Sequence, residues 1–302
     1  MRIILIGQAA FAEAVLDGLR ERGHEVVALY CPPDTPGGKP DPVKTRAASL
    51  GIAVRQHATL KSPAAQQEFA ASAADLGVLA YVTQIVPAAV IDSPRLGSIC
   101  FHPSLLPRYR GGSAIPWQII RGETQTGVTV FWTDPGIDTG PILLQKEARI
   151  GPDDTAASLY YQTLFPLGVS AVLESVDLIA AGRAPRIAQD ETRASYDPLC
   201  GDEHAGIDWS RSVEQVYNLI RGCDPQPGAY AVRNGAKIRL YDAQRVQNDT
   251  LSPGVIGEIG DGGVVVGARG GAIRVGRFRV GEKKIAASEA AKELGLTVGV
   301  RL

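Results

Sequence analysis

Strand and helix patterns alternate strictly along the first hundred residues. The first apolar run, "RIILIG" at residues 2–7, is continuous, as in a parallel strand that is buried on both faces. Further strands are predicted at residues 25–31, 52–57, 78–82 and 97–102. Between them, apolar residues at helical spacing predict helices at residues 11–24, 41–51 and 62–77. This order predicts an α/β domain with a Rossmann-like, mostly parallel sheet and helices on both faces.

The pattern changes after residue 110. Residues 127–134 and 140–150 alternate as paired strands do, and residues 158–182 predict a long helix. Between the two strands lies "PGIDTG", in which two glycines and a proline surround Asp138. Such a composition favours a shaped loop that presents the aspartate, rather than a solvated turn.

A second composition begins near residue 204. One amphipathic helix at residues 212–222 is followed by short strands that Asn-Gly and Gly-Gly turns separate. The sequence therefore predicts two domains. The α/β domain spans residues 1–203, and a small C-terminal β-barrel domain, OB-like, spans residues 204–302.

Bulk properties exclude several function classes. The formal net charge of −1 gives no global attraction to nucleic acid or membrane. The longest apolar runs fall short of the roughly 20 residues that span a bilayer, and the N-terminus is typical of a first strand rather than a signal peptide. The four cysteines lack C-x-x-C spacing, so neither a metal site nor a disulfide framework is predicted. A reducing cytoplasm is the expected compartment.

Nucleotide-binding motifs are missing. The turn after the first strand, "GQAAFAEA", lacks G-x-G-x-x-G, and no P-loop is present. The glycine-rich stretch at residues 263–271 lies among strands and predicts a hairpin. No nucleotide cofactor is therefore expected.

His102 is the most informative of the four histidines. It ends the strand at residues 97–102, and parallel sheets bind ligands outside the carboxyl ends of their strands. A buried structural histidine and a proton-transfer group are both compatible with this position. Ser104 is not in a G-x-S-x-G elbow, so it is expected to be a turn or cap residue.

His102, "SLLPRYRGG" at residues 104–112 and "GIDTG" at residues 136–140 together resemble the folate-dependent formyltransferase family. The family signature is Asn-x-His, then Ser-Leu-Leu-Pro, with an Asp in a Gly-x-Asp-x-Gly loop. Residues 207–230 also resemble the start of the family's C-terminal β-barrel domain. The resemblance thus covers nearly the whole chain.

Within this family, the order and spacing of the segments are similar to the N-terminal hydrolase domain of 10-formyltetrahydrofolate dehydrogenase. The sequence has no counterpart of that enzyme's acyl-carrier and aldehyde dehydrogenase domains, so no NADP-linked oxidation is expected. Cys100 stands where transferases have the signature Asn. The dehydrogenase-type domain carries an apolar residue there, so the departure points toward that subgroup.

The resemblance implies an enzyme that releases or transfers the formyl group of its co-substrate 10-formyltetrahydrofolate, giving tetrahydrofolate. His102 would move the proton, and Asp138 would orient the imidazole or a water. Residues implied to hold the folate are Gln84, Ile85, Val86, Pro87, Ser104, Leu105, Trp132, Asp134, Gly136 and Ile137. Gly7, Gln84, His102 and Asp138 are expected around one pocket at the carboxyl edge of the sheet.

Three roles remain open for Cys100, which strand periodicity places on the same side as His102. The residue packs as a small hydrophobe, makes a weak polar contact to the formyl group, or is a covalent nucleophile. A transferase Asn would donate a hydrogen bond to the tetrahedral oxyanion. Because a thiol is a weak donor, that contribution is largely missing here.

The acceptor also remains open: water, an amino sugar, methionyl-tRNA or another amine. The loop at residues 32–45 holds only two lysines. That argues weakly against tRNA, because phosphate contacts dominate the affinity for nucleic acids. A low-activity folate-binding protein is the alternative outside catalysis, and no membrane partner is expected.

Overall fold

A computed structural model describes all residues from 1 to 302, and its backbone contacts form two compact units. The first comprises residues 1–112, 127–148 and 163–196. The second comprises residues 113–126, 149–162 and 197–302. The two short stretches thus group with the C-terminal residues, and the single division at residue 203 stays a prediction.

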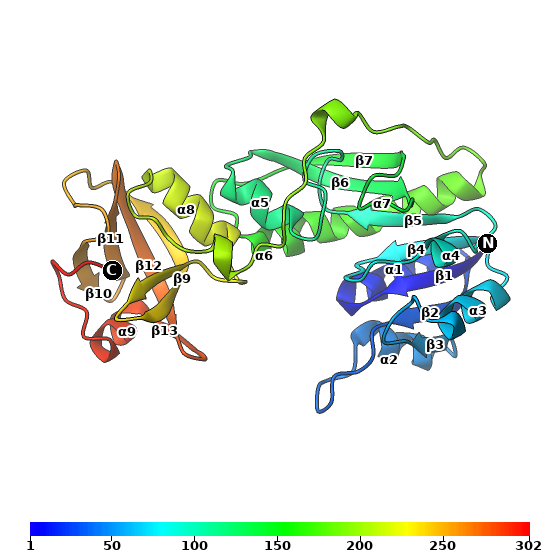
Figure 1. Ribbon diagram of the computed structural model, residues 1–302, viewed down its shortest axis with the longest axis horizontal. Helices are drawn as coiled ribbons and strands as arrows, with labels where there is room; N and C mark the ends of the chain where they lie inside the picture. The colour runs from blue at the N-terminus through cyan, green and yellow to red at the C-terminus, as the bar shows by residue number, and fades with distance from the viewer. The chain divides into compact units, whose positions relative to one another are not determined.

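A seven-stranded sheet forms the centre of the first unit, in the order β3-β2-β1-β4-β5-β6-β7 (Figure 1). The strands are β1 (Arg2–Gly7), β2 (Glu25–Cys31), β3 (Ala53–Gln56), β4 (Leu76–Ala80), β5 (Ser98–His102), β6 (Gln125–Trp132) and β7 (Ile142–Arg149). The pairs among β1–β5 are parallel, and β6 runs antiparallel to β5. The predicted mostly parallel α/β sheet is confirmed.

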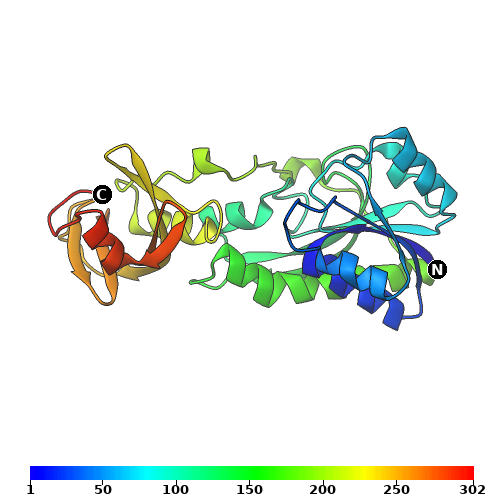
Figure 2. The same ribbon diagram turned by 90° about the horizontal axis from the view of Figure 1, so that it is seen from below.

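Helices cover both faces of this sheet. Helix α1 (Ala9–Glu21) packs against both α2 (Pro42–Ser49) and α7 (Phe165–Ala180) on one face (Figure 2). On the other face, Phe69 of α3 (Pro63–Ala71) and Val90 of α4 (Ala88–Ile91) pack with Ile4 and Ile6 of β1. Helix α3 ends at Ala71, so the expected helix to residue 77 was too long: Leu76 and Gly77 already belong to β4.

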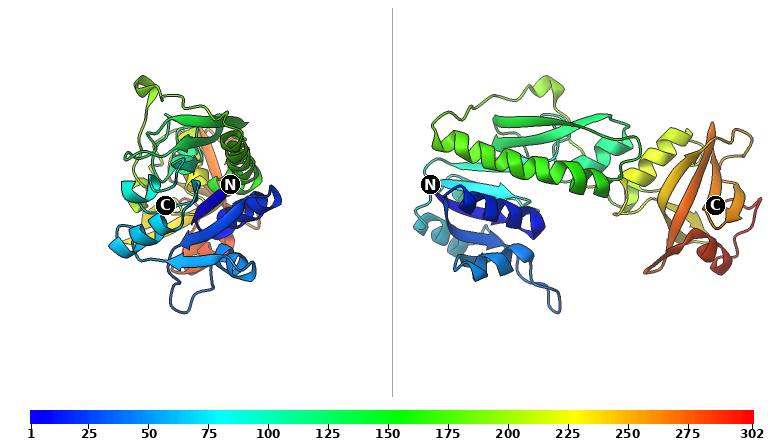
Figure 3. Two further views of the ribbon diagram at one scale, coloured as in Figure 1. Left: turned by 90° about the vertical axis from the view of Figure 1, so that its right-hand side faces the viewer. Right: turned by 180° about the vertical axis from the view of Figure 1, so that it is seen from behind.

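Helix α7 runs along the sheet as the end of a longer helical stretch (Figure 3). The stretch Ala156–Ala180 is long and apolar enough to cross a membrane by length and composition alone. It contains α6 (Ala156–Ser158), a π-helical turn at Leu159–Leu164, and α7. At Gly168 an added Cβ would lie 2.4 Å from Cε2 of Phe101 in β5, so α7 is packed as a core helix over the sheet.

Asp41 joins the starts of two helices. Its Oδ1 accepts a hydrogen bond from Val43 N at 3.0 Å and so caps α2. Both carboxylate oxygens also accept from Ala9 N, at 3.0 and 2.9 Å, at the first residue of α1. Gln8, the N-cap of α1, makes no side-chain cap bond, so Asp41 supplies the carboxylate at that end.

An antiparallel six-stranded sheet forms most of the second unit, in the order β10-β11-β12-β9-β8, with β13 also paired to β12. The strands are β8 (Tyr230–Arg233), β9 (Ala236–Val246), β10 (Ile256–Gly260), β11 (Gly263–Ala268), β12 (Gly271–Val280) and β13 (Lys283–Ala286). The expected C-terminal β domain is confirmed, with its strands in an antiparallel sheet.

Short helices accompany this second sheet. Helix α8 (Val213–Gly222) begins in a capping box of Ser212 and Gln215, and it packs against α5 (Ala114–Ile120) and β9. Helix α9 (Ala287–Glu293) packs against β12. Neither α5 nor α9 was predicted, because each spans only two turns, which is too short to show a helical period.

Candidate active site

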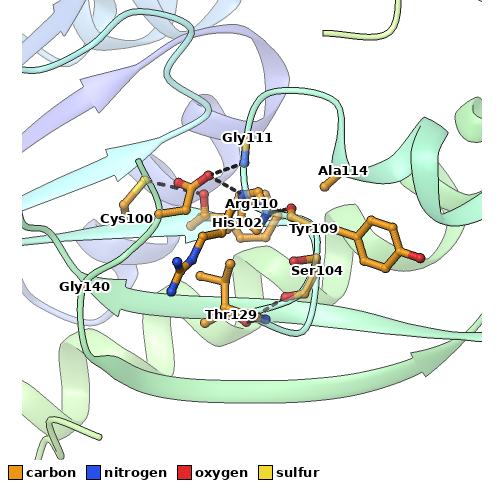
Figure 4. A network of polar contacts seen from close by, with 12 residues as sticks. Cys100, His102, Ser104, Tyr109, Arg110, Gly111, Ala114, Thr129 and Gly140 are labelled. Atoms are coloured by element: carbon orange, nitrogen blue, oxygen red, sulfur yellow. Dashed lines mark hydrogen bonds and ion pairs between the residues drawn. The ribbon is translucent and has the colours of Figure 1, made fainter. Parts of the chain in front are cut away.

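His102 is the last residue of β5 and only 5% exposed. Its Nε2 makes a 2.7 Å hydrogen bond to the carbonyl of Tyr109 (Figure 4). A carbonyl only accepts, so Nε2 carries the hydrogen. Nδ1 lies 3.5 Å from Oδ2 of Asp138. The ring can therefore gain or lose a proton at Nδ1, beside a carboxylate that stabilises the imidazolium form.

Asp138 sits in a loop that its neighbours shape. Oδ1 of Asp134 accepts from Gly136 N at 3.0 Å and from the Thr139 hydroxyl at 2.6 Å. At Gly140 a Cβ would lie 1.7 Å from the carbonyl oxygen of Trp132, so only glycine fits that position. Asp138 itself adopts the left-handed conformation, with φ of 56°. The predicted shaped loop is confirmed.

The Asp138 carboxylate is fixed by a backbone amide. Gly111 N donates to Oδ2 at 2.7 Å (Figure 4). This amide follows Tyr109 by two residues, so one short loop holds both His102 and Asp138. Their separation of 3.5 Å confirms that the two side chains meet.

A second set of bonds supports the loop after His102. The Thr129 hydroxyl donates to Ser104 O at 2.6 Å and accepts from Leu106 N at 3.1 Å. Gln145 Nε2 donates to Leu106 O and to the Thr129 hydroxyl, each at 2.9 Å. The Ser104 hydroxyl is fully buried and donates to Arg108 O at 2.6 Å, as expected of a turn residue. This network fixes the path of the chain toward Tyr109.

A third set of bonds reaches the aspartate loop from residues far along the chain. Gln189 Nε2 donates to the carbonyls of Asp138 and Gly140, each at 2.8 Å. Its Oε1 accepts from Nη2 and Nε of Arg110, at 2.7 and 3.2 Å. Arg110 is buried, and its guanidinium also binds both carboxylate oxygens of Glu191.

Cys100 is half-buried and lies two residues before His102 on β5. Burial, and secondarily the Asp138 carboxylate, raises the pKa of its thiol far above the usual value. The group is therefore a neutral thiol at physiological pH, whereas a cysteine nucleophile acts as thiolate. Its side chain packs against the buried cluster that includes Ile4 and Ile6 of β1 and Leu79 of β4.

The residues predicted to hold folate occupy different surroundings. Gln84 and Gly7 line a pocket with Tyr30 and Tyr81 at the carboxyl ends of β1, β2 and β4. His102 and Asp138 do not line that pocket, so the expectation of one pocket for all four residues stays a prediction. Cys100, Phe101 and His102 are the last three residues of β5, the strand next to β4.

The remaining predicted folate residues lie after β4 (Ile85, Val86, Pro87), after β5 (Ser104, Leu105), at the end of β6 (Trp132) and in the loop before β7 (Asp134, Gly136, Ile137). Ile85 is 65% exposed and Ile137 is 46% exposed, so both offer apolar surface to a ligand. Trp132 instead is buried, and its indole nitrogen donates to Pro185 O at 2.8 Å. Asp134 and Gly136 shape the loop of Asp138 as described above. The side chains of Val86, Pro87 and Leu105 are half-buried, and Gly136 is exposed.

Several residues around the site were not singled out from the sequence. Tyr109, Arg110 and Gly111 lie within the "RYRGG" stretch, but two of them act through backbone atoms, which leave no side-chain signal. Gln189 lies 51 residues after Asp138, and nothing in its local sequence marks it. The structure contains no group of three or more His, Cys, Asp or Glu side chains that could hold a metal ion.

Two regions of the chain match known protein families. Residues 1–173 match the formyl transferase family, and residues 201–294 match the formyl transferase C-terminal domain. The chain belongs to the formyl transferase family. All seven strands of the first sheet, together with His102 and Asp138, lie in the first matched region, and the antiparallel sheet lies in the second.

Relatives within the formyl transferase family carry different activities. The mitochondrial 10-formyltetrahydrofolate dehydrogenase of Homo sapiens is 42% identical over 261 residues, or 84% of this chain and 28% of that protein. This chain thus spans less than a third of the length of that relative. The methionyl-tRNA formyltransferase of Geobacter sulfurreducens is 38% identical over 308 aligned residues, covering 100% of this chain and 96% of that protein.

Solved structures share the formyl transferase fold at lower identity. HypX from Aquifex aeolicus, in complex with tetrahydrofolic acid, superimposes with a TM-score of 0.73 at 21% identity. That match covers 99% of this chain and 48% of HypX. The sugar 3N-formyl transferase WlaRD, solved with dTDP and 5-N-formyl-THF, has a TM-score of 0.70 at 19% identity. It covers 91% of this chain and 97% of WlaRD.

Proposed function

We propose that this protein releases or transfers the formyl group of 10-formyltetrahydrofolate, giving tetrahydrofolate. The observation that carries the proposal is the buried His102–Asp138 pair, with Nδ1 and Oδ2 3.5 Å apart at the carboxyl end of β5. Family membership supports it, as do relatives named for formyltetrahydrofolate and for formyl transfer.

The chemistry follows from the fixed tautomer of His102. A formyl group on a folate nitrogen is an activated amide, so attack on its carbon gives a tetrahedral oxyanion. Nδ1 of His102 takes the proton from the attacking water or amine and returns it to the leaving folate nitrogen as the carbon–nitrogen bond breaks. Asp138 stabilises the imidazolium in between.

Asp138 has a second task in this proposal. Gly111 N occupies its Oδ2, and Oδ1 makes no hydrogen bond within the protein. Oδ1 is therefore available to orient the attacking water or amine. The folate is held at the edge where Ile85 and Ile137 are exposed, with Gln84 and Pro87 on the same loop as Ile85.

Two observations favour different acceptors. Cys100 in place of the Asn donor removes one oxyanion contact and favours hydrolysis, as in the dehydrogenase-type domain. The full-length match to a methionyl-tRNA formyltransferase favours transfer to an amine on tRNA, and the sugar formyltransferase fold makes an amino sugar a further candidate. We propose hydrolysis first and transfer as the alternative.

Product analysis separates these functions. The protein is incubated with 10-formyltetrahydrofolate alone and then with methionyl-tRNA or a nucleotide-linked amino sugar. Formate with tetrahydrofolate in the first incubation supports hydrolysis, and a formylated amine supports transfer. Saturable folate binding without product in any incubation would contradict catalysis and support a low-activity folate-binding protein.

A further inference from the structure

We propose that Gln189 is a positioning residue that holds Asp138 against His102, and that Arg110 fixes Gln189 in turn. This inference rests on the proposed function, in which Asp138 assists proton transfer. Gln189 does not touch the imidazole itself. Its amide reaches the backbone on both sides of the aspartate, at the carbonyls of Asp138 and Gly140.

Asp138 needs such support because of its backbone. A residue with a side chain is strained in the left-handed region, and φ at Asp138 is 56°. Strained conformations persist only where the surroundings over-determine them. The two bonds from Gln189, each 2.8 Å long, fix the orientations of the peptide planes after Asp138 and Gly140. These planes set the direction in which the carboxylate projects.

The orientation of the Gln189 amide is unambiguous. Arg110 has donors only, so the atom facing its Nε and Nη2 must be Oε1 of Gln189. The amide nitrogen then faces the two carbonyls, which only accept. A glutamate at this position would still accept hydrogen bonds from Arg110, now as an ion pair, but it would present an oxygen to two carbonyl oxygens.

Arg110 connects the two loops of the site. Its side chain is buried against Gln189 and Glu191, while the next residue, Gly111, donates to the Asp138 carboxylate. Its preceding residue, Tyr109, accepts from His102 (Figure 4). Asp138 is thus bonded at its carboxylate by Gly111 and at its carbonyl by Gln189. Arg110 contributes to both contacts, because it precedes Gly111 in the chain and its side chain binds Gln189.

The first test is kinetic and uses the full-length protein. Gln189→Ala and Gln189→Glu are each expected to lower kcat for formyl release at least 10-fold and to change KM for the folate less than 2-fold. Gln118→Ala is the matched control, because Gln118 is a buried amide that donates to Ala114 O within α5 and accepts from Thr126. The control is expected to keep kcat within 2-fold. Equal losses in all three variants would overturn the proposal.

A double-mutant cycle tests the route of action. If Gln189 acts through Asp138, then Gln189→Ala in an Asp138→Asn background should lower kcat less than 2-fold further. Full additivity of the two losses would show that Gln189 acts independently of Asp138 and would overturn the positioning role. Thermal melting of each variant checks that Gln189→Glu, which keeps the volume and the Arg110 partner, is folded.

A measurement without substrate separates this proposal from the proposed function. The 15N resonances of the His102 ring are recorded at one pH and assigned by comparison with His102→Gln. In Gln189→Ala the Nδ1 resonance is expected to move, because Asp138 leaves its neighbourhood, while Nε2 remains bonded to Tyr109. An unchanged Nδ1 resonance would overturn the positioning role. A shifted resonance in a protein without formyl release would uphold it and count against the proposed function alone.

Discussion

At the residue scale, the tautomer of His102 decides what the site can do. Tyr109 supplies a neutral acceptor for Nε2, so that nitrogen is committed whether the ring is neutral or charged. Proton exchange is left to Nδ1 beside Asp138. In the proposed reaction, acid and base steps would therefore use the same nitrogen, and a single carboxylate would stabilise the charge between them.

Substitution of either partner should abolish most formyl release. His102→Ala removes the proton carrier, and Asp138→Ala removes the charge beside it. Each is expected to lower the rate about 100-fold or more, because general acid–base steps contribute roughly 10²–10⁴-fold. Rates of tetrahydrofolate formation, measured with folate affinity and thermal melting, check this. A near-normal rate in either variant would mean that the roles are misassigned.

Substitution of Cys100, in contrast to that of His102 or Asp138, is expected to leave most activity intact. Because burial keeps it a thiol, Cys100→Ala should retain most activity and cost about 1–2 kcal/mol of stability through the lost sulfur. Cys100→Asn should supply an oxyanion donor and raise transfer to an amine relative to hydrolysis. The ratio of formylated amine to formate measures this. A folded Cys100→Ala variant with normal folate affinity and no turnover would instead establish a cysteine-dependent enzyme.

At the element scale, α7 packs against the strand β5 that ends in His102. Gly168→Ala would place a Cβ 2.4 Å from Phe101, whose neighbours along β5 are Cys100 and His102. Such overpacking should lower the free energy of unfolding by about 1–3 kcal/mol. Denaturant titration measures the change.

The control for this substitution lies in α1. There, the added Cβ of Gly18→Ala would lie 2.4 Å from a terminal methyl group of Leu173, the end of a flexible side chain that can shift more easily than a buried aromatic ring. The gain in helix propensity, up to about 1 kcal/mol, should then leave Gly18→Ala close to the wild type. A Gly168→Ala variant as stable as Gly18→Ala would contradict the packing argument.

The same scale shows what the sequence can predict. Strands β1 to β5 were expected because continuous apolar runs and helical periods are local signals, and so was the loop around Asp138. The meeting of His102 with Asp138 followed from strand ends and a family signature. Tyr109, Gly111 and Gln189 could not be predicted in the same way. Their contributions are backbone atoms or bonds across 51 residues, which only the folded chain brings together.

At the scale of the whole molecule, we expect the pH dependence of stability to include a contribution from the carboxylate of Asp202. Hydrogen bonds from Arg239 and then Lys237 lower the pKa of Asp202. A depressed folded-state pKa stabilises the protein above the unfolded value of about 3.9 and loses that contribution as the pH falls through the folded value. The side chain is 39% exposed, so solvent limits the contribution to about 1 kcal/mol or less.

Asp202→Asn should therefore be less stable than the wild type at pH 7, by no more than about 1 kcal/mol. The difference should narrow below about pH 4, as the wild-type carboxylate gains its proton. Thermal unfolding between pH 7 and pH 3 measures both, with the exposed Asp249→Asn as the control. A difference that widens in acid would contradict the assignment.

Asp41 has a consequence for the choice of acceptor. The first turn of a helix after a β-strand is a common seat for phosphate groups, which bind its free amides and its positive dipole end. Here the amide of Ala9 is already bonded to both oxygens of Asp41. An incoming phosphate would meet a fixed negative charge at that turn and would have to displace it. The protein thus carries its own anion there, and a phosphorylated acceptor must be anchored by other groups.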